Sequence, residues 1–299
     1  MDERSAVLIV NPNAGRNRAD AAREVELFRQ RCGALGVRVE VAPTGGPGDA
    51  GRLAAGAARS GVRDVVARGG DGTVHEVVQG LVGTSARLLV WPAGTANVLA
   101  RQLGLPRAAT GAAKVFLEGR TRRLTLGVAA SERTGERRYF FMMAGVGLDA
   151  SVVRGVRPAL KRRVGEAAFW YAGLGHLANW RPREFEVEVG GEVFKATYAA
   201  VGKAPWYGGG LAITPRARLD AEEFEVCLIS TRSRVRYLRL LGLALRGGVA
   251  AEGASGVCFR TARRLRATGD ALVQADGELI GELPMTFEMA PHGLEVLVP

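Results

Sequence analysis

Short apolar runs alternate with longer stretches of helical periodicity through about the first 120 residues. Such alternation is typical of strands joined by crossover helices, and it predicts a mainly parallel sheet with helices on both faces. The expected strands are Ala6–Val10, Val37–Val41, Asp64–Arg68 and Arg87–Trp91, and the expected helices lie near Asp20–Ala34, Asp49–Ser60, Val74–Leu81 and Asn97–Leu103. The first part of the chain is therefore expected to be an α/β domain.

From about Thr121 the chain shows strand-like alternation of apolar and polar residues, as in FEVEVGGEVFKATYAAVG and EFEVCLIS. This pattern predicts an antiparallel, β-sandwich-like region. The paired glycines of EVGGEV predict a two-residue hairpin turn, because glycine readily takes the positive φ angles that such a turn needs. Two helical interludes are expected within this region, at Pro158–Asn179 and Val235–Arg246.

The composition of the 299-residue chain is that of a folded protein, with 47% hydrophobic and 24% charged residues. Its net charge of +11 would attract phosphates, anionic lipids or nucleic acid. No nucleic-acid recognition motif accompanies that charge, so a nucleic-acid partner is not expected. The three cysteines are far apart and indicate neither a disulfide framework nor a zinc site. No run approaches the roughly 20 apolar residues of a membrane span, so a cytoplasmic location is expected.

The stretch VVARGGDGTVHEVVQGLVG places Gly69, Gly70, Asp71 and Gly72 between an expected strand and an expected helix. Such a joint can cradle phosphate, because unpaired N–H groups and the positive end of the helix dipole point at the same place. It can equally be a tight turn in which Asp71 caps the helix. The residues of this joint alone leave both interpretations open.

Two further loops, in VNPNAGR and WPAGTANVLAR, are rich in small residues and asparagine and also follow expected strands. Because ligands of open α/β sheets bind outside the carboxyl ends of the strands, the three loops are expected to converge there. The chain has no G-x-x-x-x-G-K-[ST] motif, and no G-x-G-x-x-G motif opens a helix after the first strand. An ordinary P-loop protein or dehydrogenase is therefore disfavoured.

The ordered series NPNAG, GGDGT with HEVVQGL, PAGTANVLA and GVGLDA resembles the diacylglycerol kinase catalytic domain family, which includes bacterial lipid kinases, sphingosine kinases and ceramide kinase. The resemblance covers nearly the whole chain, and Asp276, Gly277 and Glu278 match the family's D-G-E element. It implies an ATP-dependent lipid kinase that phosphorylates diacylglycerol or a related lipid. It also implies a nucleotide-binding domain at residues 1–126, completed by 288–299, and a lipid-substrate domain at residues 127–287.

The same resemblance assigns roles to individual residues. ATP and Mg²⁺ are the implied cofactors, with Asp71 organising Mg²⁺ and the phosphates and Glu278 accepting the proton of the attacking hydroxyl. The residues implied at the nucleotide are Asn11, Asn13, Thr44, Gly69, Gly70, Gly72, Thr73 and Thr95. These roles are physically reasonable, since phosphoryl transfer needs charge neutralisation, alignment and a positioned base more than covalent chemistry.

Three positions depart from the family pattern. Val98 and Thr125 each stand where relatives often have an acid, and Ala221 replaces one aspartate of a paired element that in some members holds a structural Mg²⁺. A hard cation prefers several oxygen ligands, so a second metal site at Asp220 is doubtful. These departures leave open a change of substrate, weak activity or a non-catalytic lipid- or nucleotide-binding protein. A kinase for a soluble substrate, like NAD kinases that share GGDGT, is the other alternative.

The expected partner is a lipid substrate at a membrane surface, met by peripheral contact. Residues 154–180 suit that contact, because they combine five basic residues with an aromatic cluster. The basic residues are Arg154, Arg157, Lys161, Arg162 and Arg163, and the aromatic ones are Phe169, Trp170, Tyr171 and Trp180. A solvated basic turn followed by a packed helix is the alternative interpretation. A homodimer is compatible with the sequence, which does not set the oligomeric state.

Overall fold

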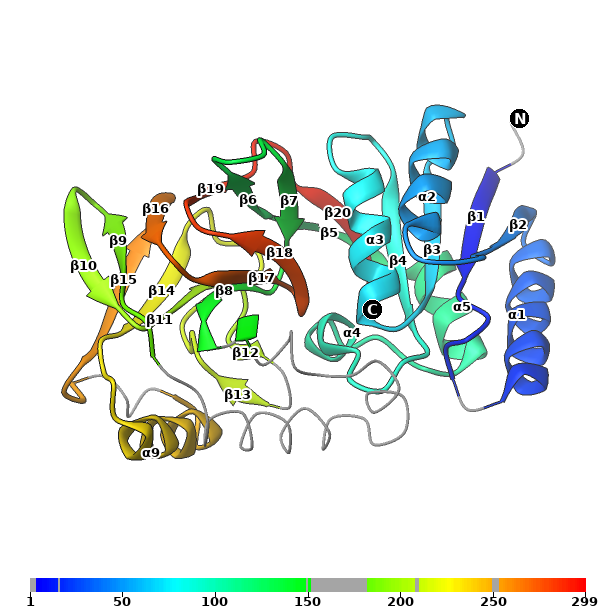
Figure 1. The fold of residues 1–299 in the computed structure, drawn as a ribbon. Coiled ribbons are helices and arrows are strands. Elements are labelled where there is room, and N and C mark those ends of the chain that lie inside the picture. Colours follow the sequence, from blue (N-terminus) through cyan, green and yellow to red (C-terminus); the bar gives the residue numbers. More distant parts are fainter. Residues whose placement is uncertain (1–3, 16, 149, 152–181, 208–209, 249–252) are drawn as a thin grey trace. The chain divides into compact units, whose positions relative to one another are not determined.

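The computed structural model describes the chain from Arg4 to Pro299 except residues 16, 149, 152–181, 208–209 and 249–252 (Figure 1). It divides into two compact units, the first comprising Met1–Leu124 with His292–Pro299 and the second comprising Thr125–Pro291. The expected helix at Pro158–Asn179 and the basic and aromatic segment 154–180 lie outside the described residues. Among the described helices, none is both long and apolar enough to cross a membrane.

The first unit is built on a six-stranded sheet in the order β2-β1-β3-β4-β20-β5. Neighbouring strands are parallel except that β5 runs antiparallel to β20. The strand from the end of the chain therefore lies between β4 and β5. The strands are β1 Arg4–Val10, β2 Val37–Pro43, β3 Asp64–Gly69, β4 Arg87–Pro92, β5 Arg120–Leu124 and β20 Leu294–Val298.

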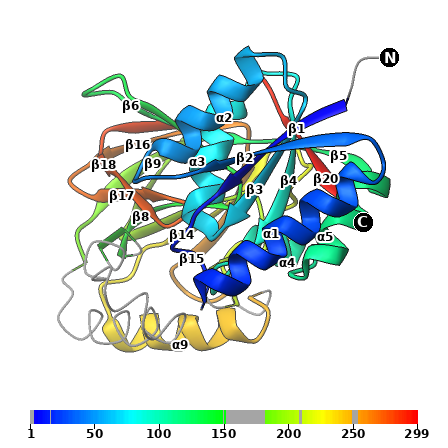
Figure 2. The same cartoon turned by 90° about the vertical axis from the view of Figure 1, so that its right-hand side faces the viewer.

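Helices cover both faces of this sheet: α2 and α3 pack together on one face, and α1 and α5 on the other (Figure 2). In α3 the buried residues Val74, Val77, Val78 and Leu81 follow the spacing of one helical face, which explains why the helix lies flat on the sheet. On the opposite face Phe28 stacks on Trp91 with ring centroids 5.1 Å apart. The helices are α1 Arg18–Gly33, α2 Asp49–Arg59, α3 Asp71–Leu81, α4 Val98–Gln102 and α5 Ala109–Glu118.

The second unit contains two six-stranded antiparallel sheets, β10-β9-β16-β19-β6-β7 and β15-β14-β11-β8-β17-β18. One apolar core, including Phe140, Val187, Phe224 and Phe287, joins residues of both sheets, so they form the expected sandwich. The strands are β6 Gly127–Ser131, β7 Arg137–Phe140, β8 Met143–Gly147, β9 Phe185–Val189, β10 Glu192–Ala196, β11 Tyr198–Gly202, β14 Phe224–Ile229, β15 Val257–Ala262, β16 Arg264–Gly269, β17 Leu272–Ala275, β18 Glu278–Glu282 and β19 Met285–Met289.

The predicted hairpin turn is confirmed at Gly190 and Gly191, which join β9 to β10 with φ angles of 61° and 82°. Positive φ at both central residues matches the twist of the flanking strands, which is why glycines occupy them. The helix expected near Val235–Arg246 is α9 Arg234–Leu245. A short pair of strands, β12 Trp206–Tyr207 and β13 Leu211–Ala212, completes the described elements of the second unit.

Candidate functional site

Loops from the carboxyl ends of β1, β3 and β4 converge in the first unit, as predicted. The loops after β3 and β4 touch through their backbones: a Cβ added at Gly94 would lie 2.6 Å from the Cα of Gly70. The loop after β1 joins them through Asn11, whose Nδ2 donates a hydrogen bond of 3.1 Å to the hydroxyl of Thr73. A side chain at Gly94 would force these loops apart, so the glycine at this position permits a close backbone contact that a larger residue would not allow.

The end of β3 has a similar steric requirement. A Cβ at Gly69 would lie only 2.4 Å from the Cβ of Thr73, one turn into α3. The absence of a side chain lets Thr73 fold back over the strand end, where its hydroxyl accepts the bond from Asn11. Gly69 and Thr73 thus set the sharp angle between β3 and α3.

The amino terminus of α3 supplies the backbone donors of the site. Its cap residue is Gly70, which has no side chain to accept them. The first N–H groups of an α-helix have no intrahelical partner, and the helix dipole adds positive potential at the same point. This is the arrangement that binds phosphate groups at helix amino termini.

Asp71 lies in the first turn of α3, but its carboxylate caps a different helix. Oδ2 accepts a 2.9 Å hydrogen bond from the N–H of Asn97, and Oδ1 accepts a 2.8 Å bond from the N–H of Val98, where α4 begins. The helix that Asp71 caps is therefore α4, and not α3 as the tight-turn interpretation assumed. Each carboxylate oxygen has two acceptor positions, so these bonds leave the carboxylate chemically able to bind a metal-bound water as well.

Asn97 holds the other end of this contact. It has a positive φ of 46° and is buried, with its Nδ2 donating to the carbonyl of Gly94 at 2.6 Å and its Oδ1 accepting from the N–H of Gly94 at 2.9 Å. Arg107 also donates to the Gly94 carbonyl. The loop after β4 is thus fixed at both ends, by its own asparagine and by Asp71.

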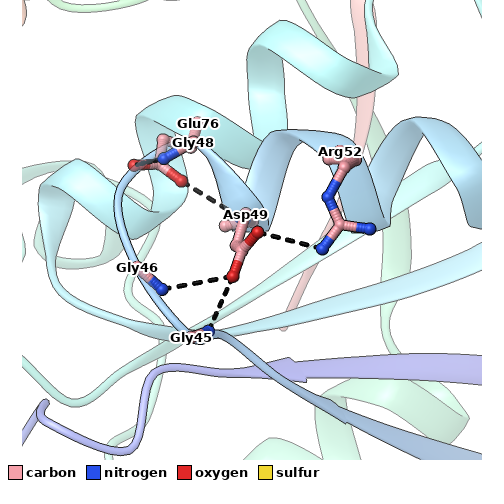
Figure 3. A network of polar contacts seen from close by, with 7 residues as sticks. Gly45, Gly46, Gly48, Asp49, Arg52 and Glu76 are labelled. Atoms are coloured by element: carbon pink, nitrogen blue, oxygen red, sulfur yellow. Dashed lines mark hydrogen bonds and ion pairs between the residues drawn. The ribbon is translucent and has the colours of Figure 1, made fainter.

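Two further carboxylates, those of Asp49 and Glu76, shape the loop between β2 and α2 (Figure 3). Thr44 belongs to this loop. Asp49 accepts hydrogen bonds from the N–H groups of Gly45 at 2.8 Å and Gly46 at 3.1 Å. Glu76 of α3 accepts from the N–H of Gly48 at 2.8 Å and that of Ala50 at 3.1 Å, so it caps α2. The backbone donors of this loop are therefore directed at protein carboxylates.

Hydrogen bonds also affect the acidity of Asp49. The side-chain bond from Arg52, followed by that from the Gly45 amide, lowers the pKa of the Asp49 carboxyl below its ordinary value. Asp49 therefore stays ionised as the cap of this loop at neutral pH. The hydrogen bonds that the Asp49 and Glu76 carboxylates accept are charge-assisted, and such bonds are stronger than those between neutral groups.

The remaining predicted nucleotide residues of the first unit border these loops. The N–H of Thr44 donates to the carbonyl of Val10 at 2.9 Å, so β2 and β1 stay paired where their loops begin. The N–H of Asn13 donates to Oδ1 of Asn11 at 2.9 Å, and the carbonyl of exposed Thr95 accepts from Arg101. The structure thus brings the predicted residues of the first unit to one edge of its sheet.

Glu278 belongs to the second unit, where it is the first residue of β18 and half-buried. The preceding turn is rigidly held: Asp276 has a φ of 48°, and its carboxylate accepts backbone bonds from Phe141, Met142 and Met143 at 2.9, 2.9 and 3.0 Å. Gly277 donates to the buried side chain of Gln274 at 2.7 Å. Asp276 and Gln274 therefore fix the backbone from which Glu278 projects.

The surroundings of Asp220 do not fit the doubtful second metal site. Asp220 forms an ion pair with Arg218 at 3.1 Å. Beside it, the carbonyl of Ala221 accepts hydrogen bonds from the ammonium of Lys203 and from the hydroxyl of Thr125. Protein donors, one of them cationic, therefore occupy this backbone oxygen, which a hard cation could otherwise use as a ligand. Among the residues that the structure describes, no group of three or more His, Cys, Asp or Glu side chains could hold a metal.

Lys203 is fully buried in the second unit. Burial lowers the pKa of its ammonium to about 8, against the opposing effect of the nearby Asp220 carboxylate. The ammonium form still predominates at neutral pH, so this lysine places a positive charge inside the protein beside Ala221.

Sequence reasoning missed several residues that hold the site together, namely Asp49, Glu76, Asn97, Gln274 and Lys203. Their partners are backbone groups brought close by the fold, and no motif spacing records them. Only Asp49 carried a sequence signal, because an acidic residue at the start of an expected helix indicates a capping role. The same rule would not have identified Glu76, because its side chain caps a neighbouring helix.

A mainly parallel sheet whose carboxyl-end loops meet around a glycine-rich strand–helix joint, together with an antiparallel sandwich, defines a two-domain α/β protein. Residues 5–129 match the model of the diacylglycerol kinase catalytic domain, and residues 142–298 match that of the YegS C-terminal NAD kinase beta sandwich-like domain. The chain belongs to the diacylglycerol kinase family of lipid kinases.

Similar proteins match over nearly their full length. The diacylglycerol kinase of Bacillus subtilis is 29% identical over 98% of this chain and 96% of that protein. That of Mycobacterium tuberculosis is 30% identical over 97% of this chain and 94% of that protein. A putative diacylglycerol kinase from Bacillus anthracis has the same fold, with a TM-score of 0.80, 22% identity, and coverage of 99% of this chain and 95% of that chain.

Proposed function

We propose that this chain transfers the γ-phosphoryl group of ATP to a hydroxyl of diacylglycerol or a related lipid. The observation that carries the proposal is the junction of the loops at Gly70 and Gly94, fixed by the Asp71 carboxylate, in a member of a lipid kinase family. The relatives named diacylglycerol kinase support the choice of substrate class.

The amino terminus of α3 would bind the phosphates of ATP. The residues proposed to border the nucleotide are the predicted set Asn11, Asn13, Thr44, Gly69, Gly70, Gly72, Thr73 and Thr95. Asp71 fits an indirect contact with Mg²⁺ through water, because its two oxygens already accept backbone N–H bonds. When bound, Mg²⁺ neutralises phosphate charge. The protein's own contribution is to hold the loops and backbone donors in place before ATP arrives.

Glu278 is the proposed base. A carboxylate can accept the hydroxyl proton when it lies within hydrogen-bond reach, and its position must be fixed before reaction. The rigid Asp276–Gly277 turn provides that fixed position. We further propose that the lipid is met at a membrane surface by a cytoplasmic protein in peripheral contact, with residues 154–180 contributing to that contact.

One assay tests the proposal. Purified protein is incubated with radiolabelled ATP and Mg²⁺ over mixed micelles of diacylglycerol, monoacylglycerol, sphingosine or ceramide, with NAD in detergent-free buffer as the soluble control. Label transferred to at least one lipid, and lost with Glu278→Gln while the protein stays folded, is the expected result. Label transferred only to NAD would establish the soluble-substrate alternative. ATP binding without transfer to any acceptor would establish a non-catalytic binding protein.

A further inference from the structure

The amino edge of the first unit's sheet contains a pocket of about 450 Å³. Its lining comes from segments that precede β3 and β4, from the start of β20 and the two residues before it, and from the end of the antiparallel β5. It therefore lies at the edge opposite the nucleotide loops. The strands between the two edges are about 20 Å long at roughly 3.3 Å per residue. The pocket volume falls within the range of about 300–1,000 Å³ that is usual for small-molecule sites.

Two arginines and a histidine, from three separate segments, meet in this pocket. Arg63 precedes β3, Arg123 lies in β5, and His292 precedes β20. Within the described part of the chain, neither arginine's guanidinium has a hydrogen bond or ion pair with another protein group. Two unpaired guanidinium groups around one cavity form an anion-binding arrangement, because each offers several N–H donors in a plane that matches a phosphate.

The nearest buried acid cannot neutralise these arginines. Asp64, which follows Arg63, is 2% exposed and already binds two other arginines, Arg4 at 3.0 Å and Arg87 at 2.6 Å. The start of β20 leaves room for one of the pocket arginines: a Cβ at Gly293 would lie 2.8 Å from Nε of Arg123. The glycine therefore lets the Arg123 side chain lie across the start of β20 toward the pocket.

The lining also contains an acid and hydroxyl groups, which narrows the ligand class. Glu295 of β20 faces the pocket beside Arg123, its partner in the β20–β5 register, and Ser85 lies on the β4 side. A carboxylate would repel a bare phosphate, but it accepts hydrogen bonds from the hydroxyls of a ligand. A phosphate that carries a polyol satisfies both the arginines and the glutamate.

We propose that this pocket binds a polyol phosphate, with the phosphate on Arg63, Arg123 and His292 and a hydroxyl on Glu295. The same chemistry is available from a free compound such as glycerol 3-phosphate and from the headgroup of phosphatidylglycerol. The proposal does not depend on the kinase function, because the site lies at the other edge of the sheet and its test measures binding.

The test is calorimetric titration of the full chain with sn-glycerol 3-phosphate and with orthophosphate, after the nucleotide loops have been saturated with a non-hydrolysable ATP analogue and Mg²⁺. The expected result is binding of glycerol 3-phosphate that is stronger than that of orthophosphate. The double variant Arg63→Ser/Arg123→Ser should weaken this binding by about tenfold or more, since two charge-assisted contacts are lost. Both arginines are exposed, and thermal melting confirms that the variant is folded.

Matched variants make the result specific. Arg23→Ser removes an exposed arginine of α1 and should leave the affinity unchanged. Glu295→Gln should reduce the preference for glycerol 3-phosphate over orthophosphate. A flotation assay with vesicles of phosphatidylglycerol in phosphatidylcholine, compared with phosphatidylcholine alone, distinguishes the two sources of the ligand. Binding to the vesicles that depends on Arg63 and Arg123 identifies the lipid headgroup. Calorimetric binding that depends on the same arginines identifies the free compound. If neither form shows binding that depends on Arg63 and Arg123, the proposal is wrong, and an unchanged preference in Glu295→Gln overturns the polyol assignment.

Discussion

The carboxylate of Asp71 accepts a 2.8 Å hydrogen bond from the backbone N–H of Val98. With the companion bond from Asn97, it ties the loop after β4 to the first turn of α3. This contact uses only the backbone of Val98, so the absence of an acidic side chain there does not affect it. Asp71 therefore orders the site through the loop, in addition to any contact with Mg²⁺.

Replacing Asp71 should separate these effects. Asp71→Asn keeps one acceptor oxygen but turns an NH₂ group toward a backbone donor, and we expect a loss of about 1–3 kcal/mol in the free energy of unfolding. Lipid kinase activity should fall by about 100-fold or more, because the loop loses its anchor and the proposed water-mediated contact with Mg²⁺ loses its negative charge. Urea unfolding and kcat measurements check both. Asp20→Asn, an exposed change in the first turn of α1, is the control, and full activity in Asp71→Asn would contradict the assigned role.

The contact between Gly70 and Gly94 leads to a second prediction. In Gly94→Ala the new methyl group would meet the Gly70 backbone at 2.6 Å, so the loops must separate. We expect a loss of about 1–3 kcal/mol in stability and a raised KM for ATP. Gly56→Ala is the control, since nothing lies within 4 Å of its added Cβ in the middle of α2. That change should stabilise the protein by up to about 1 kcal/mol. Equal effects of the two substitutions would rule out the steric explanation.

The periodic elements of the first unit were predictable, and the contacts that order its site were not. The expected helix Asp49–Ser60 and the observed α2, Asp49–Arg59, agree because apolar period and an acidic first turn act locally. Helix α5 was missed; it begins after Ala108, which offers no side-chain cap to signal a start. The bond from Val98 to Asp71 joins residues 27 positions apart, a distance that only the sheet topology brings together.

Asp276 gives a third prediction. Asp276→Ala removes the acceptor of three backbone N–H groups and places alanine at a φ of 48°, so we expect a loss of about 3–5 kcal/mol. Asp276→Asn should lose less, because asparagine tolerates this conformation and keeps one acceptor oxygen. If Asp276 positions Glu278, kcat should fall in both variants with little change in the KM for ATP. Stability lost without any change in kcat would show a purely structural role.

Buried Lys203 gives a pH prediction whose sign follows from its lowered pKa of about 8, against an ordinary 10.5. Between these values the unfolded chain binds more protons than the folded one, so the free energy of unfolding contributed by this group rises with pH. From pH 7.5 to 9.5 the rise should be about 2 kcal/mol. In Lys203→Met that contribution is absent.

Urea unfolding of the wild-type protein and of Lys203→Met at the two pH values measures this contribution. It equals the difference between the two proteins in how much the free energy of unfolding rises with pH. Other titrating groups cancel in this comparison, because they are the same in both proteins. Equal rises in the two proteins would contradict the buried charge.

Adding Mg²⁺ or EDTA should leave the urea midpoint of the wild-type protein unchanged, because Lys203 and Thr125 already occupy the Ala221 carbonyl. A midpoint that falls on chelation would show that a structural cation binds at Asp220 after all.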